Sequence, residues 1–163
     1  MSLNSLQDLF VEQLQDLYSA EQQFAAAQEK IAGQVSDSEL KQGVEMHVQQ
    51  TKEQISRLEQ VAQVCDLGSL NGKTCQAAKG LVAEADELLG EDGDPAVKDA
   101  GIIASLQRVE HYEMAGYGTV VAFAEKLGHQ DAVSLLQQTL DEEKVTDAKL
   151  SQLAESSINA QAV

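Results

Sequence analysis

The chain has 163 residues, a length that suits a single domain with a continuous core. One proline and few aromatic residues stand beside many strong helix formers, so the composition indicates an all-helical protein. The formal net charge of -16 at pH 7 argues against nucleic acid and anionic membrane surfaces as partners, because both would be repelled. The same charge favours cations, although an acidic surface also serves solubility alone.

The first ten residues alternate polar and apolar side chains without a basic start, so we expect no signal peptide. No segment contains a run of about 20 apolar residues, the length that a membrane-spanning helix requires. Cys65 and Cys75 are too few and too irregularly placed for a disulfide framework or a zinc site, although a single bridge that closes a short loop stays open. The sequence therefore predicts a cytoplasmic protein that is not bound to a membrane.

Two long helices are expected in the first part of the chain. Apolar residues recur at helical spacing over residues 2–33, and Gly33 is a natural end for this helix. Ser36 and Glu39 have the spacing of a capping box, which predicts the start of a second helix over residues 37–66.

The second part of the chain predicts one short helix and two long ones. Turn-prone sequence flanks an amphipathic segment at residues 74–89, so this segment is expected to be a short helix within a long crossover. A third long helix is expected over residues 95–127 and ends at Gly128. A fourth is expected over residues 131–155, with a frayed tail beyond Ser156.

Loop lengths indicate how these helices are connected. Two tight hairpins joined by one long crossover are the connectivity of ferritin-like bundles, whereas a simple up-and-down bundle uses three short loops. The sequence therefore predicts an all-α fold over residues 1–163, a ferritin-like four-helix bundle with a short fifth helix in the crossover.

Polar side chains interrupt each apolar stripe near the middle of its helix. In an antiparallel hairpin, residues equidistant from the connecting turn lie at the same depth. Glu21 therefore faces the region of His47 across the first turn, and Glu113 faces residues 143–147 across the second. The interrupting side chains are Glu21, His47, Gln50, Thr51, Glu110, Glu113, Tyr117, Glu143 and Asp147.

Carboxylates buried in a bundle core without a partner would cost several kcal/mol each, so a positive group is expected beside them. Carboxylate and imidazole side chains on facing helices suit iron or manganese. A hydrogen-bonded polar layer that is partly neutralised by protons is the alternative. The sequence therefore predicts a metal site formed by Glu21, His47, Glu110, Glu113, Glu143 and Asp147, with Gln50, Thr51 and Tyr117 as lesser or neighbouring groups.

Several motifs together resemble the YciF-type family of bacterial stress proteins, and the resemblance covers nearly the whole chain. The motifs are Tyr18-Ser-Ala-Glu21, His47 followed by Thr51, Arg108-Val-Glu110-His-Tyr-Glu113, Tyr117-Gly-Thr119 and Asp141-Glu-Glu143-Lys144. The resemblance implies a ferritin-like, rubrerythrin-related fold, a homodimer and a role in the stress response.

The same resemblance implies which residues bind metal and where this sequence departs from the family. It implies ligands at Glu21, His47, Glu110, Glu113 and Glu143. It also implies a glutamate at position 50, where this sequence has Gln50, and a neutral amide there favours weaker binding or a single metal ion.

Two functions from different classes follow. The first is an oxidoreductase of peroxidase or ferroxidase type, in which two metal ions react with peroxide or dioxygen. Iron is the first choice of metal and manganese the second. Glu113 and Glu143 are expected to bridge the two ions. Its electron donor is unknown, and a single-metal or metal-free state stays open. The second is a non-catalytic structural or interaction bundle with a vestigial metal site. Iron storage in a large cage is less favoured, because nothing in the sequence signals such an assembly.

Overall fold

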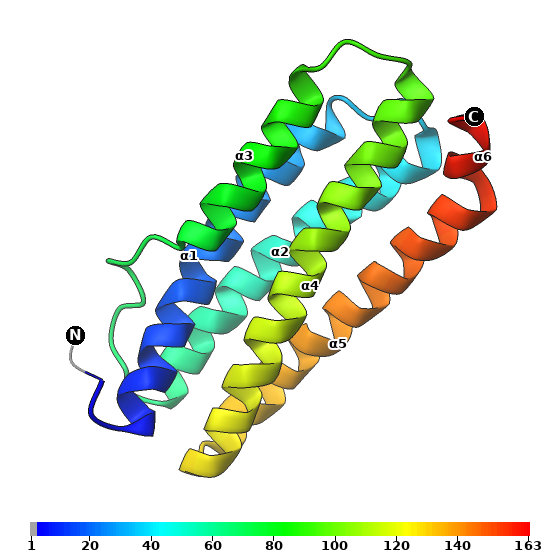
Figure 1. Cartoon of the computed structure of the whole chain (residues 1–163). Coiled ribbons are helices and arrows are strands. Elements are labelled where there is room, and N and C mark those ends of the chain that lie inside the picture. The colour runs from blue at the N-terminus through cyan, green and yellow to red at the C-terminus, as the bar shows by residue number, and fades with distance from the viewer. Residues whose placement is uncertain (1–2) are drawn as a thin grey trace.

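The computed structural model describes residues 3–163 as a bundle of long helices (Figure 1). No strand occurs among these residues, so the prediction of an all-α fold is confirmed. A short helix, α3 (Gln76–Gly90), lies in the crossover, as predicted. The long helices are α1 (Leu6–Ala32), α2 (Ser38–Val64), α4 (Pro95–Leu127) and α5 (Gln130–Leu153).

Two short turns and one long crossover connect the helices (Figure 1). Residues 33–37 turn the chain from α1 into the antiparallel α2, and residues 128–129 turn α4 into α5. The second turn uses Gly128 at φ 81°, the left-handed conformation that glycine adopts without strain. Helix α3 packs on the outside of α1 and α4, while α1, α2, α4 and α5 form the four sides of the bundle. This is the predicted ferritin-like connectivity.

Two aspartates hold the turn between α1 and α2. Asp37 caps α2, because its side chain accepts hydrogen bonds of 2.9 Å from the N–H groups of Glu39 and Leu40. The N–H groups of Ser36 and Asp37 donate to the buried carboxylate of Asp99 on α4, at 3.0 and 2.7 Å. The prediction that Ser36 caps this helix is therefore wrong. Its backbone is tied to α4, and Asp37 reaches the free N–H groups of the first turn.

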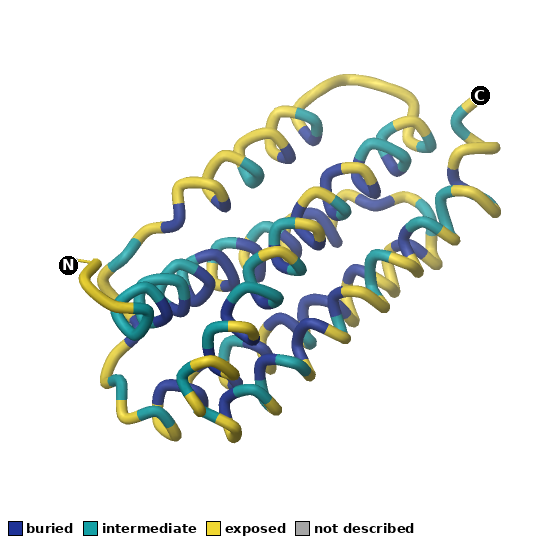
Figure 2. Tube along the Cα trace, turned by 60° about the horizontal axis from the view of Figure 1, so that its bottom comes forward, coloured by how far each residue is buried: buried dark blue, intermediate teal, exposed yellow. Residues whose placement is uncertain are grey.

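The core contains three apolar clusters, of which the smallest joins α1, α3 and α4 and includes Phe24, Ala78 and Val109. A polar layer separates the two larger clusters, and buried positions run along the inner side of every long helix (Figure 2). Each long helix contributes to both clusters and crosses the polar layer between them. Buried members of the first cluster include Phe10, Leu14, Leu58, Val61, Val120 and Leu136. Buried members of the second include Ile31, Leu40, Val44, Ile102, Leu106 and Leu150.

The C-terminal tail continues the last helix and packs on the bundle. A π-helical turn, η1 (Ala154–Ile158), follows α5 directly and leads into the short α6 (Asn159–Gln161). Ile158 is 1 % exposed and belongs to the second apolar cluster. The prediction of a frayed tail beyond Ser156 is therefore wrong, because this single apolar side chain anchors an otherwise polar segment.

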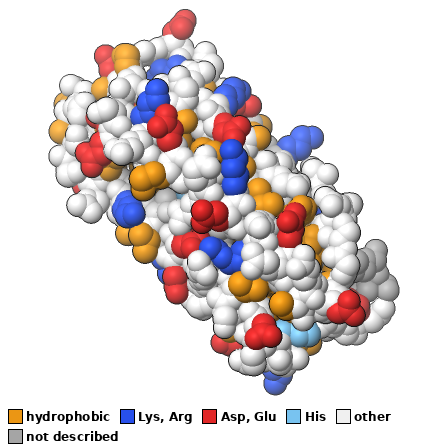
Figure 3. Space-filling model, turned by 180° about the vertical axis from the view of Figure 1, so that it is seen from behind, with side chains coloured by type: hydrophobic (Ala, Val, Ile, Leu, Met, Phe, Trp, Pro, Cys, Tyr) orange, Lys and Arg blue, Asp and Glu red, His pale blue; other side chains and the backbone are white. Residues whose placement is uncertain are grey.

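Acidic and basic side chains are interspersed over the face of the molecule that Figure 3 shows. Among the helices of residues 3–163, none has the length and hydropathy needed to cross a bilayer.

We predict that Asp99→Ala weakens the bundle without touching the polar layer. The substitution leaves two backbone N–H groups without their carboxylate acceptor, so the free energy of unfolding should fall by about 2–3 kcal/mol. Urea denaturation measures this change. Asp141→Ala, at an exposed position of α5, is the control and should change stability by less than about 0.5 kcal/mol. Equal, small effects of both substitutions would show that Asp99 does not hold the turn.

Candidate metal centre

Five titratable side chains meet in the polar layer between the two larger apolar clusters. The glutamates are completely buried, at 0 % exposure, and the histidine is 5 % exposed. They come from all four long helices, because each helix places one or two of them on its inner face at the same depth. The five side chains are Glu21 of α1, His47 of α2, Glu110 and Glu113 of α4, and Glu143 of α5.

Three of these groups are close enough to bind one ion. His47 Nδ1 lies 3.4 Å from Glu110 Oε1, and His47 Nε2 lies 3.6 Å from Glu143 Oε2. One ligand atom from each of His47, Glu110 and Glu143 can be chosen so that all three lie within 4.8 Å of one another. A ring nitrogen and two carboxylate oxygens are a donor set that suits iron, manganese or zinc. The structure thus brings together one candidate metal site from three different helices.

The other two glutamates form a second pair beside this site. Glu21 and Glu113 interact through their carboxyl groups, and the charge of Glu143 raises the pKa of both. Tyr117, buried one turn further along α4 from Glu113, donates its hydroxyl proton to Glu21 Oε1. Glu143 therefore lies between two sets of groups.

Amide and hydroxyl groups surround the carboxylates and hold the histidine. The Gln28 amide lies 3.3 Å from His47 Nδ1, and Thr51 Oγ1 donates to Gln28 Oε1 at 3.0 Å. Gln54 Nε2 donates to Glu143 Oε1. These contacts fix the imidazole and one carboxylate in place, as the neighbours of metal ligands commonly do.

Burial controls the charge state of the carboxyl groups. Burial raises the pKa of Glu21 to about 8, and the charge of Glu143 adds to this rise. Burial likewise raises the pKa of Glu110 to about 11, together with the nearby carboxylate of Glu143. The pKa of Glu113 lies well above its usual value because of burial and the charges of Glu21 and Glu143. Without a cation, Glu21 and Glu110 therefore carry protons at neutral pH.

The polar layer also contains every buried side-chain nitrogen or oxygen that lacks a hydrogen-bond partner within residues 3–163. Native proteins rarely leave such atoms unpaired, so their concentration in one layer requires an explanation. The atoms are Glu21 Oε2, His47 Nε2, Gln54 Oε1, both carboxyl oxygens of Glu110 and of Glu113, and Glu143 Oε2.

Two residues predicted with the site lie outside this cluster. Asp147 is half-buried; its Oδ1 accepts a hydrogen bond of 3.0 Å from Gln107 and lies 3.3 Å from His111 Nε2. Gln50 is also half-buried and accepts from Thr146 Oγ1 at 3.5 Å. The structure therefore places Asp147 with two α4 side chains and Gln50 at the gap between α2 and α5, whereas Thr51 and Tyr117 lie against the cluster.

Sequence reasoning missed Gln28 and Gln54, which contact the cluster directly. Each follows a predicted site residue by seven positions, Gln28 after Glu21 and Gln54 after His47. A seven-residue step returns to nearly the same face of a helix, so this spacing is the signal that could have found them.

A buried ion pair beside the cluster was missed as well. Arg57 of α2 donates to both carboxylate oxygens of Glu142, at 2.8 and 3.0 Å, and to Thr139 Oγ1 at 2.6 Å. Glu142 neighbours Glu143, and its Oε2 also accepts at 3.2 Å from Gln54 Nε2, the amide that donates to Glu143. Glu142 neutralises the arginine, so Arg57 is not a free counter-ion for the buried glutamates.

Comparisons with known proteins place the chain in a family. The family model described as "Domain of unknown function (DUF892)" matches residues 5–163. The protein YciF of Escherichia coli (strain K12) is 40 % identical over 162 residues, which cover 99 % of this chain and 98 % of YciF.

Solved structures agree with this relationship. The crystal structure of the E. coli stress protein YciF superposes with a TM-score of 0.92 at 40 % identity, over 96 % of this chain and 98 % of that one. YcfI of Rhodopseudomonas palustris, provisionally described as a structural protein, gives a TM-score of 0.87 at 44 % identity, over 92 % and 95 %. A Xanthomonas campestris protein shares the fold at 21 % identity, with a TM-score of 0.77 over 96 % and 95 % of the two chains. The chain thus belongs to the DUF892 family and, as its motifs indicated, is a homologue of the stress protein YciF.

Proposed function

We propose that the chain binds metal ions at the polar layer and acts in the stress response as a redox metalloprotein. The concentration of unpaired buried ligand atoms in this layer carries the proposal. His47, Glu110 and Glu143 would hold one ion, and Glu21 and Glu113 would hold a second that shares Glu143. Iron is the first choice and manganese the second, because the set is mostly carboxylate with one imidazole.

The contacts of His47 support its role as a ligand. If the Gln28 side-chain amide is turned by 180°, its oxygen accepts from His47 Nδ1–H while its nitrogen donates to Thr51 Oγ1, so both observed contacts persist. His47 Nε2 then carries a lone pair and faces Glu143. A ligating histidine commonly donates its other ring N–H in this way.

The remaining parts of the layer suit a protected redox site. When bound, two iron or manganese ions would supply the electron transfer to peroxide or dioxygen. The apolar clusters exclude water from both sides, and Tyr117 keeps Glu21 oriented by hydrogen bonding. The bridging role of Glu113 and Glu143, the homodimer and a cytoplasmic location are further parts of this proposal, and the electron donor is unknown.

A second candidate function is a structural or interaction role in which the layer binds no metal. Gln54 favours it, because its amide donates to Glu143 Oε1 and so occupies a carboxylate oxygen that a metal ion would otherwise use. YcfI of R. palustris, 44 % identical, is provisionally described as a structural protein. On this alternative, protons neutralise the layer and its hydrogen bonds fix the helix register.

Metal content separates the two functions. We predict that protein purified without chelators and reloaded with Fe²⁺ or Mn²⁺ holds about two ions per chain, by elemental analysis, if the two sets of groups share Glu143. Glu143→Gln should lose at least one ion. Asp141→Asn is the matched control, because this carboxylate of the same helix is exposed and pairs with Lys144 at 3.6 Å, away from the cluster, and it should retain the wild-type content.

A wild-type protein that retains no metal after reloading would reject the metalloprotein and favour the structural role. Equal losses in Glu143→Gln and Asp141→Asn would mean that the ions bind elsewhere on the acidic surface.

The raised pKa values predict that the metal-free protein loses stability as pH rises. Glu21 has a pKa of about 8 when folded against an ordinary value of 4.5, so between these pH values unfolding releases its proton. Stability should therefore fall by about 1.4 kcal/mol per pH unit for each such group. Urea denaturation in chelator between about pH 5.5 and 7.5 measures the slope.

Glu110→Gln supplies the comparison, because its neutral side chain releases no proton on unfolding, whereas Glu110 has a pKa of about 11 when folded. The slope should drop by about 1.4 kcal/mol per pH unit relative to the wild type. Identical slopes would show that Glu110 is ionised in the folded protein.

The redox part of the proposal predicts turnover by the metal-loaded protein. We expect iron-loaded wild-type protein to consume hydrogen peroxide or to oxidise Fe²⁺ faster than buffer, and Glu113→Gln to lower the rate by about tenfold or more. Absorbance assays of peroxide and Fe³⁺ follow both reactions. Rates at the buffer level in a protein that does hold two ions would reject the redox role and leave a metal-binding structural protein.

A further inference from the structure

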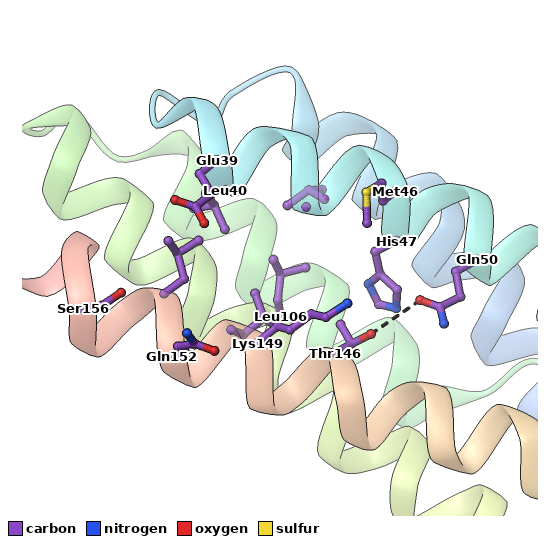
Figure 4. Close-up of a pocket in the computed structure, with 14 residues that line it drawn as sticks. Glu39, Leu40, Met46, His47, Gln50, Leu106, Thr146, Lys149, Gln152 and Ser156 are labelled. Atoms are coloured by element: carbon purple, nitrogen blue, oxygen red, sulfur yellow. Dashed lines mark hydrogen bonds between the residues drawn. The ribbon is translucent and has the colours of Figure 1, made fainter.

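An open pocket lies between α2 and α5, next to the metal centre (Figure 4). Its volume is about 360 Å³, and its far end is formed by residues of the C-terminal π-helical turn. Packed protein interiors contain few voids larger than a water molecule, whereas small-molecule sites occupy roughly 300–1,000 Å³. The pocket therefore has the size of a ligand site.

The walls of the pocket are largely apolar. Leu40 and Val44 of α2, Leu106 of α4 and Leu150 of α5 line it and are buried, with exposures of 1 %, 2 %, 2 % and 8 %. Leu153 continues this surface toward the tail. These walls suit an aliphatic chain, which would remove their remaining apolar area from water.

Polar groups gather at the inner end of the pocket. His47, Gln50 and Thr146 lie together there, and the Lys149 side chain extends along the pocket with its ammonium group toward His47 (Figure 4). Across residues 3–163, no carboxylate lies within ion-pair distance of Lys149. His47 itself is 5 % exposed and its Nε2 has no hydrogen-bond partner. Lys149 is an exposed residue that lines the open pocket, so its unpaired ammonium group is free to pair with an anionic ligand that enters there, in a chain that otherwise has a net charge of -16.

The two ends of the pocket define how such a ligand would lie. Glu39 lies at the opposite end from His47 and would repel an anion there (Figure 4). The single ammonium of Lys149, with the Thr146 hydroxyl and the Gln50 amide beside it, matches the charge and the two oxygens of a carboxylate. We infer that this pocket binds an aliphatic carboxylate of medium chain length, with its carboxylate at Lys149 and its alkyl chain along Leu40, Val44, Leu106 and Leu150.

This inference does not rest on bound metal, although His47 joins the two sites. His47 lines the pocket and also faces Glu110 and Glu143 in the metal centre. A bound carboxylate would therefore lie near a side chain that also faces the metal ligands. A ligand in the pocket and an ion in the metal centre would thus share His47 as a neighbour.

Gly43 allows the pocket to be filled without disturbing the bundle. It lines the pocket, and a Cβ atom built there meets no atom within 4 Å. Gly80 of α3 is the matched control, because it is also an exposed glycine near the start of a helix with no atom within 4 Å of a Cβ. In both cases, glycine to leucine favours the helix by about 0.5–1 kcal/mol, so neither variant should unfold.

The test is calorimetric titration of sodium decanoate, below its micellar concentration, into the full-length protein in chelator. We expect saturable binding of one decanoate per chain by the wild type and by Gly80→Leu. Gly43→Leu and Lys149→Met should weaken binding by about tenfold or more, the first by filling the pocket and the second by removing the ammonium group. Decanol, which has the same chain without the charge, should also bind about tenfold more weakly.

Three outcomes would overturn the inference. They are the absence of saturable decanoate binding, unchanged binding in both Gly43→Leu and Lys149→Met, and decanol binding as tight as decanoate. Because the titration uses metal-free protein, none of these outcomes bears on metal binding, and a protein that holds no metal can still bind decanoate.

Discussion

The structure depends on how four carboxyl groups and an imidazole are kept inside a core that excludes water. Each carboxylate left charged and unpaired there would cost several kcal/mol, against a total folding free energy of about 5–15 kcal/mol for a typical domain. The pKa values of Glu21 and Glu110, raised by burial to about 8 and about 11, indicate that protons meet this constraint in the metal-free bundle. A cation would meet it by releasing those protons, so metal binding and proton release are one equilibrium.

The two larger apolar clusters stabilise the bundle around the buried carboxyl groups and fix the register of its helices. They lie on both sides of the layer and hold all four long helices, so the layer can form in only one register. Slippage of one helix by a turn would bring its glutamate against leucines and leave the others unpaired. The crossover with α3 and the anchor from Asp99 to the first turn fix the same register from outside the core. A layer that is costly to bury thereby also selects one packing.

Periodicity and loop length were enough to predict the helices, their connectivity and the depth of the polar layer, because all three follow from one helix or one turn at a time. Asp147 shows where this reasoning ends. It stands four residues after Glu143, but Gln107 and His111 of α4 provide its partners, and the stripe of α5 alone does not reveal them. Ile158 is similar: one buried side chain orders the tail, and only the tertiary packing shows what it contacts.

Charge balance relates the amides of the layer to the number of ions it would hold. Glu21, Glu110, Glu113 and Glu143 carry four negative charges when fully ionised, which equals the charge of two divalent cations. Gln54, which is neutral and completely buried, leaves this balance unchanged, whereas a glutamate at its position would add an uncompensated charge. One divalent cation held by His47, Glu110 and Glu143 would instead leave the carboxyl groups of Glu21 and Glu113 to retain protons, and burial raises the pKa of both. The amide is therefore compatible with a two-ion centre and, through protons, with a one-ion centre as well.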